Sequence, residues 1–274
     1  MASFDFFHEL RDDIPYNLHS HTQFCDGRAS MEEMAAAAMA EGFSHWGFSP
    51  HSPVPLTSPC NMAADNVTAY LSEAERLRNI YRGRMKIYAA MEIDYLGPDW
   101  GPSHPFFTSL PLDYRIGSVH IIPTQDGNRI DVDGSPARFA QYLKEHFHND
   151  LDYVVSTYFK QSLAMVKAGG FEIIGHLDKL RLNASAIRHD IESSQCYRTG
   201  VETLIHEIIL TGITVEMNTK HYEATGRFFP APELWQMLRG TGVPIVVNSD
   251  AHHPHLISAS RTEAIRMLRQ TAGA

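Results

Sequence analysis

Side chains that bind metal ions recur at one kind of position in this sequence, at or just after the end of a short apolar run. Imidazole and carboxylate groups are ligands that zinc, iron and manganese accept. The residues placed in this way are His19, His21, His51, Glu92, His120, His176, Asp250 and His252. A single histidine at the end of a strand is usually structural or exposed. Repetition at the same position of successive runs instead predicts a shared metal site.

The His19-Ser-His21 sequence is suited to holding one ion. Residues i and i+2 of a strand point to the same face, so both imidazoles can face the same ion. Glu92 and Asp250 carry carboxylates, which can bridge two ions. Six histidines and two carboxylates exceed the ligands that one four-coordinate ion needs. The sequence therefore predicts two or three metal ions.

The remaining histidines do not share this placement. We interpret most of them as surface or packing residues: His8, His45, His104, His146, His148, His189, His206 and His221. His253 and His255 follow His252 so closely that either is an alternative to it as a ligand.

The elements that position these residues alternate along the chain. Strands are predicted at residues 16–20, 45–50, 86–93, 114–120, 171–176, 213–218 and 243–250. Helices are predicted at residues 65–81, 136–146, 152–167, 199–210 and 232–238. A further, alanine-rich helix should begin at a capping box formed by Ser30 and Glu33 and end at Gly42. Alternation of this kind implies parallel strands joined by crossover helices.

Both a doubly wound sheet and a barrel fit this alternation. An open sheet would spread the metal-binding groups along a line that is too long for one site. A closed barrel collects them around one mouth, because functional residues of parallel barrels gather at the carboxyl ends of the strands. We therefore expect an α/β barrel of seven strands. No linker or repeat interrupts the chain, so residues 1–274 are predicted to form a single domain.

The composition restricts the function further. The charge sum is 23 − 32 = −9, with no basic surface of the kind that nucleic-acid binding needs. The cysteines Cys25, Cys60 and Cys196 are far apart, which favours reduced thiols over disulfides or a thiolate zinc site. The first residues are acidic where a signal peptide is basic, and no apolar run is long enough to cross a membrane. These features predict a cytoplasmic protein.

Six short motifs of this sequence resemble those of the polymerase and histidinol phosphatase (PHP) family. They are His19-Ser-His21 with Asp26-Gly27, Phe48-Ser-Pro-His51, Met91-Glu92-Ile93-Asp94, Gly117-Ser-Val-His120, Gly175-His176-Leu-Asp178 and Asn248-Ser-Asp250-Ala-His252. They occur in the family's order from about Asn17 to His252, and they are most similar to the monofunctional histidinol-phosphate phosphatases. The resemblance implies a distorted TIM-like (β/α)7 barrel and three divalent ions of zinc, iron or manganese. It also implies hydrolysis of L-histidinol phosphate to L-histidinol and phosphate, a step of histidine biosynthesis.

The resemblance also implies a distribution of ligands. His19 and His21 would hold a first ion with bridging Glu92 and Asp250, Glu92 and His120 a second with His176 as a further candidate, and His51 and His252 a third. The chain departs from the family at one place. The related phosphatases have Cys-Pro-His-Gly after the first motif, whereas this chain has Cys25-Asp26-Gly27. Other family members use an aspartate there, so Asp26 is expected to replace the missing histidine.

A metal-bridged hydroxide is the expected nucleophile. Metal coordination lowers the pKa of water towards neutrality, and charge neutralisation must supply most of the acceleration for a phosphate monoester. Asp250 is expected to accept the proton of the attacking water, and Glu92 to bridge the ions as the second catalytic carboxylate.

Phosphate binding is expected from cationic side chains, because a guanidinium matches phosphate oxygens in pairs. The family resemblance points to Arg181, and Lys220 and Arg227 are weaker candidates. Asp94, Tyr95 and Asp178 are alternatives for binding the amine and imidazole of histidinol.

Two other functions compete with this one. The first is a PHP phosphoesterase for another small monoester, such as a nucleotide or sugar phosphate. The acidic composition argues against an exonuclease. The second is a metal-binding scaffold without turnover. A small-molecule substrate is expected as the partner, with no nucleic acid, membrane or obligate protein partner.

Overall fold

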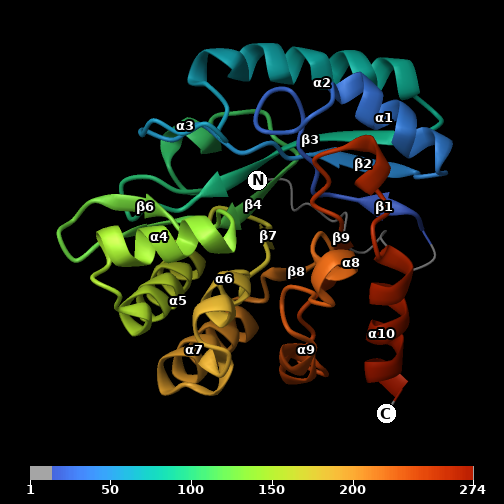
Figure 1. The fold of residues 1–274 in the computed structure, drawn as a ribbon. Helices are drawn as coiled ribbons and strands as arrows, with labels where there is room; N and C mark the ends of the chain where they lie inside the picture. Colours follow the sequence, from blue (N-terminus) through green and yellow to red (C-terminus); the bar gives the residue numbers. More distant parts are fainter. Residues whose placement is uncertain (1–13, 274) are drawn as a thin grey trace.

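Seven parallel strands form the centre of the fold. We analysed a computed structural model, which describes residues 14–273; His8 and the acidic start of the chain lie outside this range (Figure 1). The strands are β1 (Tyr16–Asn17), β2 (His45–Phe48), β3 (Lys86–Asp94), β4 (Tyr114–Ser118), β7 (Ile173–Ile174), β8 (Thr214–Asn218) and β9 (Ile245–Asn248), adjacent in that order. Each of the seven predicted runs overlaps one of them.

The sheet closes on itself almost completely. The only backbone bridge between the β1 and β9 segments, within the described residues, joins Ser20 and Ala251. Two asparagine side chains accept hydrogen bonds from backbone amides where a longer strand pairing would otherwise run. The Leu18 amide donates to Asn248 Oδ1 at 2.8 Å, and the Ser249 amide donates to Asn17 Oδ1 at 2.7 Å. The predicted distorted seven-stranded barrel is therefore confirmed.

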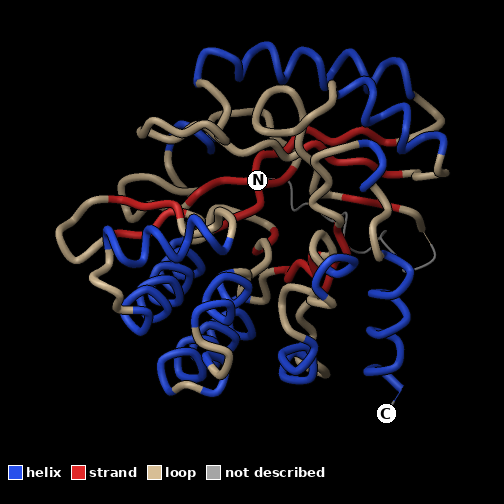
Figure 2. Tube along the Cα trace, viewed as in Figure 1, coloured by secondary structure: helices blue, strands red, loops and turns tan. Residues whose placement is uncertain are grey.

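Helices cover the outside of the strands, as Figure 2 shows. The longer ones are α1 (Met31–Ala40), α2 (Val67–Tyr81), α4 (Pro136–His146), α5 (Leu151–Ala168), α6 (Leu180–Ile187), α7 (Gln195–Thr211), α9 (Pro232–Leu238) and α10 (Arg261–Gly273). Short turns of helix are α3 (Pro105–Thr108), α8 (Tyr222–Thr225), η2 (Ala64–Asn66), η3 (Ile191–Ser193) and η4 (Pro254–Leu256). The predicted capping box is confirmed, because Ser30 Oγ accepts from the Glu33 amide and Glu33 Oε2 accepts from the Ser30 amide.

An apolar layer fills the barrel interior on the amino-terminal side of the predicted ligands. It consists of Tyr16, Leu18, Ala90, Tyr114, Ile116, Ile173 and Val246, all buried. The Tyr114 hydroxyl reaches across to donate to the Leu18 carbonyl. A Cβ on Gly47 would lie 1.9 Å from that hydroxyl, so only glycine fits at this point of β2. This layer closes one end of the barrel and leaves the other end for chemistry.

Helices α6 and α10 and one strand pair were not predicted from the sequence. After β4 the chain forms an antiparallel hairpin of β5 (Ile121–Pro123) and β6 (Arg129–Asp131), outside the barrel sheet. Its turn contains Gly127 at φ 82°, in the left-handed region that favours glycine. The hairpin leads into α4 and supplies part of the wall of the functional site.

Candidate metal centre

The nine predicted ligands meet at the carboxyl ends of the barrel strands. His19 and His21 follow β1, His51 follows β2, His120 follows β4, His176 follows β7, and Asp250 and His252 follow β9. Glu92 lies within β3, and Asp26 lies in the loop before α1. His19 and His21 are fully buried, and Glu92 and Asp250 are 1% exposed. So many ionisable groups inside a protein require compensating charges.

Glu92 occupies the centre of the cluster. Its Oε1 lies 2.8 Å from His176 Nε2 and 3.3 Å from His120 Nε2. Its Oε2 lies 3.1 Å from His51 Nδ1 and 3.2 Å from His19 Nε2. Burial raises the pKa of the Glu92 carboxyl, but the surrounding histidines lower it by more, so that the net pKa is well below its usual range. This carboxylate is therefore an anion with both oxygens facing imidazole nitrogens.

Asp250, which follows β9, approaches the same nitrogen of His21 as Glu92 does. Asp250 Oδ1 is 3.1 Å from His21 Nε2, 3.4 Å from His252 Nδ1 and 3.2 Å from Lys220 Nζ. The backbone of Asp250 has φ 49°, a left-handed conformation that is uncommon outside glycine. Such strained residues concentrate at functional sites. Burial raises the pKa of this carboxyl, but Lys220 and the histidines hold it well below the usual value.

Among residues 14–273, three overlapping sets of side chains have the spacing of metal ligands. In each set, one ligand atom from every residue lies within 4.8 Å of the others. The sets are His21, Asp26, His51 and His252; His19, His21 and Asp250; and His51, Glu92 and His120. His21 and His51 belong to two sets each.

The donor atoms of these sets fit divalent metal ions. All are imidazole nitrogens or carboxylate oxygens, which suit zinc, iron or manganese. Asp26 Oδ1 and His51 Nδ1 are buried without a hydrogen-bond partner. A buried polar atom that forms no hydrogen bond costs free energy, and a metal–ligand bond would remove that cost. The residues present therefore fit a metal centre.

Asp26 lies where a ligand of the third ion was predicted. Its Oδ1 is 3.3 Å from His252 Nε2, 3.6 Å from His21 Nδ1 and 3.9 Å from His51 Nε2. The following Gly27 permits this approach, because a Cβ there would lie 2.2 Å from the Thr22 amide nitrogen. The structure also brings His176 to the cluster, where it contacts Glu92 rather than joining one of the three sets.

Two further carboxylates contact the Nδ1 atoms of His19 and His120, whose Nε2 atoms approach Glu92. Glu216 on β8 is fully buried, and its Oε1 lies 2.7 Å from His19 Nδ1. Its Oε2 accepts from the His176 amide at 2.9 Å. Asp94 Oδ1 lies 2.8 Å from His120 Nδ1. Carboxylates placed in this way fix the ring orientation of metal-binding histidines. Sequence reasoning gave Glu216 no role, although its alternation with Asn218 on one strand face was a usable signal.

We expect the Glu216→Gln variant to lower the metal affinity of the centre by about 10- to 100-fold, as loss of such an orienting group usually does. The amide keeps the shape of the side chain but removes the charge that holds His19. Competition titration with a chromophoric chelator measures this affinity. Glu172→Gln is the control, because Glu172 is a partly buried carboxylate before β7, at the other end of the barrel. An affinity equal to that of the control would contradict the orienting role.

A cavity of about 530 Å³ opens over the cluster. Four predicted ligands line it: Asp26, His51, His120 and His252. Its lining also includes Asp131, Ser135, Arg138, Lys179, Lys220 and His221. This volume suits a small molecule. His221, which was interpreted as a surface or packing residue, packs against the Phe229 ring and also lines this cavity. Burial, Lys179 and Lys220 lower the pKa of His221 to about 4, which leaves it neutral at pH 7.

Two of the three predicted phosphate ligands do not line the cavity. Arg181 points away from the cavity, with its Nε 2.9 Å from Asp178 Oδ2 and its guanidinium 5.0 Å from the Phe229 ring centroid. Arg227 donates to Ser185 Oγ at 2.8 Å. Neither arginine lines the cavity, whereas Lys220 does. Tyr95 and Asp178 do not line it either, so Asp94 is the one of these three alternatives that does.

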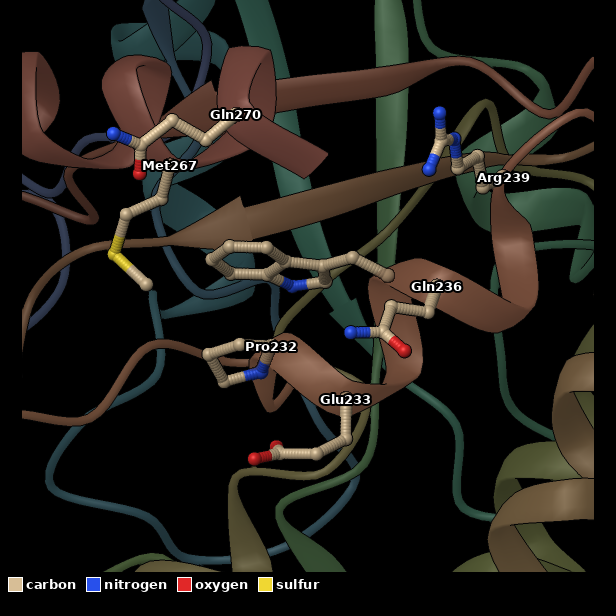
Figure 3. A pocket seen from close by; sticks show the side chains of 7 residues that line it. Pro232, Glu233, Gln236, Arg239, Met267 and Gln270 are labelled. Atoms are coloured by element: carbon tan, nitrogen blue, oxygen red, sulfur yellow. The ribbon is translucent and has the colours of Figure 1, made fainter. Parts of the chain in front are cut away.

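A second hollow of about 540 Å³ lies between α9 and α10 (Figure 3). The labelled residues Pro232, Glu233, Gln236, Arg239, Met267 and Gln270 line it. None of the predicted ligands is among them.

In the described part of the chain, no helix is long and apolar enough to cross a membrane.

Comparison with known proteins points to one family. The model of the PHP domain matches residues 17–220. A Deinococcus radiodurans protein named "Probable histidinol-phosphatase" is 24% identical, over 93% of each chain. The solved structure of HisK from Listeria monocytogenes has a TM-score of 0.80 at 18% identity, covering 90% of this chain and 99% of its own. Histidinol phosphate phosphatase from Lactococcus lactis, solved with zinc, L-histidinol and phosphate, has a TM-score of 0.70 at 18% identity, covering 94% and 93%.

Proposed function

The chain belongs to the PHP domain family, and we propose that it is a phosphoric monoester hydrolase that converts L-histidinol phosphate to L-histidinol and inorganic phosphate. The observation that carries this proposal is the set of overlapping ligand groups beneath a cavity of small-molecule size. The name of the Deinococcus radiodurans relative and the ligands of the Lactococcus lactis structure support the choice of substrate.

We propose three divalent ions of zinc, iron or manganese as the cofactor. His19, His21 and Asp250 would hold one, Glu92 and His120 a second, and Asp26 and His252 a third, with His51 available to either of the last two. When bound, such ions neutralise phosphate charge and make water a nucleophile near pH 7. His176 and Glu216 would fix the imidazoles and Glu92 in place.

The side chains around Asp250 would complete the reaction. Asp250 Oδ1 faces the cluster and can accept the proton of the attacking water. Lys220 Nζ, 3.2 Å from Asp250 Oδ1 and on the cavity wall, would supply positive charge to the phosphoryl oxygens. Glu92 would connect two ligand sets, because its Oε2 lies 3.2 Å from His19 Nε2 and its Oε1 lies 3.3 Å from His120 Nε2.

Release of inorganic phosphate from L-histidinol phosphate tests the proposal. Metal-loaded protein should release phosphate rapidly, and a chelator-treated sample should not. Nucleotide and sugar phosphates serve as competing substrates. Faster turnover of one of these would retain the metal-dependent phosphatase and discard histidinol phosphate as the substrate. No turnover of any monoester by metal-loaded protein would discard the enzymatic proposal.

Asp26 is expected to determine the number of bound ions. Asp26→Ala should remove one of three ions, because it deletes the only carboxylate of the set with His21, His51 and His252. Asp26→His should retain all three. Elemental analysis of protein after dialysis gives the number of ions per chain. Asp131→Asn, at a carboxylate of the same cavity outside the ligand sets, is the control. Three tightly bound ions in the alanine variant would show that Asp26 is not a ligand.

A further inference from the structure

The cavity contains a lysine to which the proposed function assigns no role. A phosphate monoester is a dianion, and its binding in a partly dehydrated site favours cationic partners. Among the described residues that line the cavity, the cations are Arg138, Lys179 and Lys220. Arg138 is exposed, and its guanidinium lies over the Tyr142 ring, 5.1 Å from the centroid. Lys220 contacts the metal ligands Asp250 and His252.

Lys179 differs from both because it is buried. Its side chain is 7% exposed, and lysine is almost never buried unless it is paired. Its Nζ donates to Asp133 Oδ2 at 2.7 Å and lies 4.0 Å from Asp250 Oδ2. The Asp133 carboxylate therefore pairs with this buried ammonium. The ammonium lies between the loop after the hairpin and the metal cluster.

The pairing leaves hydrogen-bonding capacity on the ammonium. An ammonium group has three N–H donors. Within the part of the chain that the structure describes, Lys179 Nζ forms one hydrogen bond, to Asp133. A buried ammonium with two further donors, on the wall of a phosphatase cavity, has the charge and the donors that a phosphoryl group accepts.

The hairpin fixes the position of this ammonium. Asp133 follows β6, and its amide donates to Asp131 Oδ1 at 2.8 Å. Lys179 lowers the pKa of Asp133 to about 2 against the effect of burial, so Asp133 remains an anion. The α6 segment is tied to the same loop by Asn183 Nδ2, which donates to the Val132 and Gly134 carbonyls at 3.0 and 2.8 Å. The ammonium is thus preorganised from two sides.

We propose that Lys179 binds the phosphoryl group of the substrate and that Asp133 is the positioning residue that aims its ammonium at the metal cluster. This inference rests on the proposed function, since it supposes a phosphate ester in the cavity. It assigns to Lys179 the role that sequence reasoning gave to Arg181.

Binding of inorganic phosphate to metal-loaded protein tests this role. Lys179→Met should raise the dissociation constant of phosphate, measured by calorimetry, by roughly 10- to 100-fold, as expected for loss of a hydrogen bond to a charged group. The metal content should equal that of the wild type. Arg138→Met is the matched control, because Arg138 is an exposed cation that lines the same cavity, and it should change the constant by less than about threefold. A constant for Lys179→Met no higher than that of this control would overturn the proposal.

A paired variant separates phosphate binding from a purely structural role. Lys179→Met leaves Asp133 buried without its partner, which can itself destabilise the fold. Lys179→Met/Asp133→Asn removes both charges together. If Lys179 binds phosphate, the double variant keeps the weakened phosphate affinity although its thermal stability recovers. If the ion pair only supports the fold, phosphate affinity recovers with stability, and the proposal fails.

The wild-type protein provides a measurement that depends on no destabilising variant. Lysine ammonium groups of ¹⁵N-labelled protein give NMR signals, and the signal that is lost in Lys179→Arg belongs to Lys179. Addition of inorganic phosphate should shift that signal; an unchanged signal at saturating phosphate would refute the contact. This result does not depend on which ester is hydrolysed. Failure of the wild type to hydrolyse L-histidinol phosphate would therefore reject the proposed substrate while leaving the phosphate contact to be decided by the binding data.

Discussion

Replacement of Asp250 by alanine should lower kcat/KM for phosphate release by about ten-thousandfold or more. Two losses combine in this variant. The first is the proton acceptor, since general base catalysis typically contributes about 10²- to 10⁴-fold. The second is a carboxylate of the ligand set with His19 and His21. Because Asp250 Oδ1 is 3.1 Å from His21 Nε2 and 3.2 Å from Lys220 Nζ, its removal also leaves the ammonium without that partner.

The rate of this variant must be compared with its metal content. Asp250→Asn keeps the size of the side chain and one oxygen, so it should retain more metal than the alanine variant while remaining nearly inactive. Asp152→Asn, at an exposed carboxylate of α5 that does not line the cavity, should stay within about threefold of wild type. Near-normal turnover of Asp250→Ala with full metal content would exclude both roles of this residue.

The placement of the ligands could be predicted because it depends on local chemistry. A strand ends where its apolar run ends, and the polar residue that follows faces the mouth of a parallel barrel. The predicted run 86–93 and the observed Lys86–Asp94 differ by one residue. β7 is shorter than its predicted run, covering only Ile173–Ile174, yet His176 still reaches Glu92. The length of a strand therefore mattered less for the site than the position of its end.

The choice between Arg181 and Lys179 could not be made from the sequence. These residues are two apart at the start of α6, where Lys179 already has helical backbone angles of φ −56° and ψ −30°. Each helical residue turns the side-chain direction by about 100°, so residues two apart point to nearly opposite sides. Lys179 faces the cavity, and Arg181 faces Asp178 and Glu192. Without the phase of the helix, the guanidinium is the better chemical match for phosphate, so sequence reasoning favours Arg181.

The hairpin was missed for a different reason. β5 and β6 have three residues each and pair only with one another, so they carry neither the length nor the alternation that identifies a strand. The role of Glu216 depends on a contact across the barrel, from β8 to His19 after β1. Strand order and register decide such a contact, and neither is encoded in one segment alone.

Replacement of Glu92 by glutamine should reduce kcat/KM by about a thousandfold and remove at least one metal ion. Glu92 is the only carboxylate in the set with His51 and His120, and its oxygens lie within 3.4 Å of nitrogens of His19, His21, His51, His120 and His176. Glutamine has the same shape but carries no charge, and its NH₂ group would turn donors towards metal ions or imidazolium groups. Loss of about 4 kcal/mol of metal-based stabilisation of the transition state corresponds to a thousandfold in rate.

Two measurements together decide the role of Glu92. Elemental analysis should show fewer ions per chain, and kcat/KM should remain low when the assay contains excess zinc or manganese. If glutamine only lowered the affinity for one ion, excess metal would restore activity. Persistent low activity instead indicates that the Glu92 carboxylate itself is needed. Glu172→Gln, a change of the same chemistry at the other end of the barrel, controls for the substitution itself and should leave the metal content unchanged. A Glu92→Gln protein with full metal content and normal turnover would show that the buried carboxylate serves the fold, and that the ions are held by histidines and Asp250 alone.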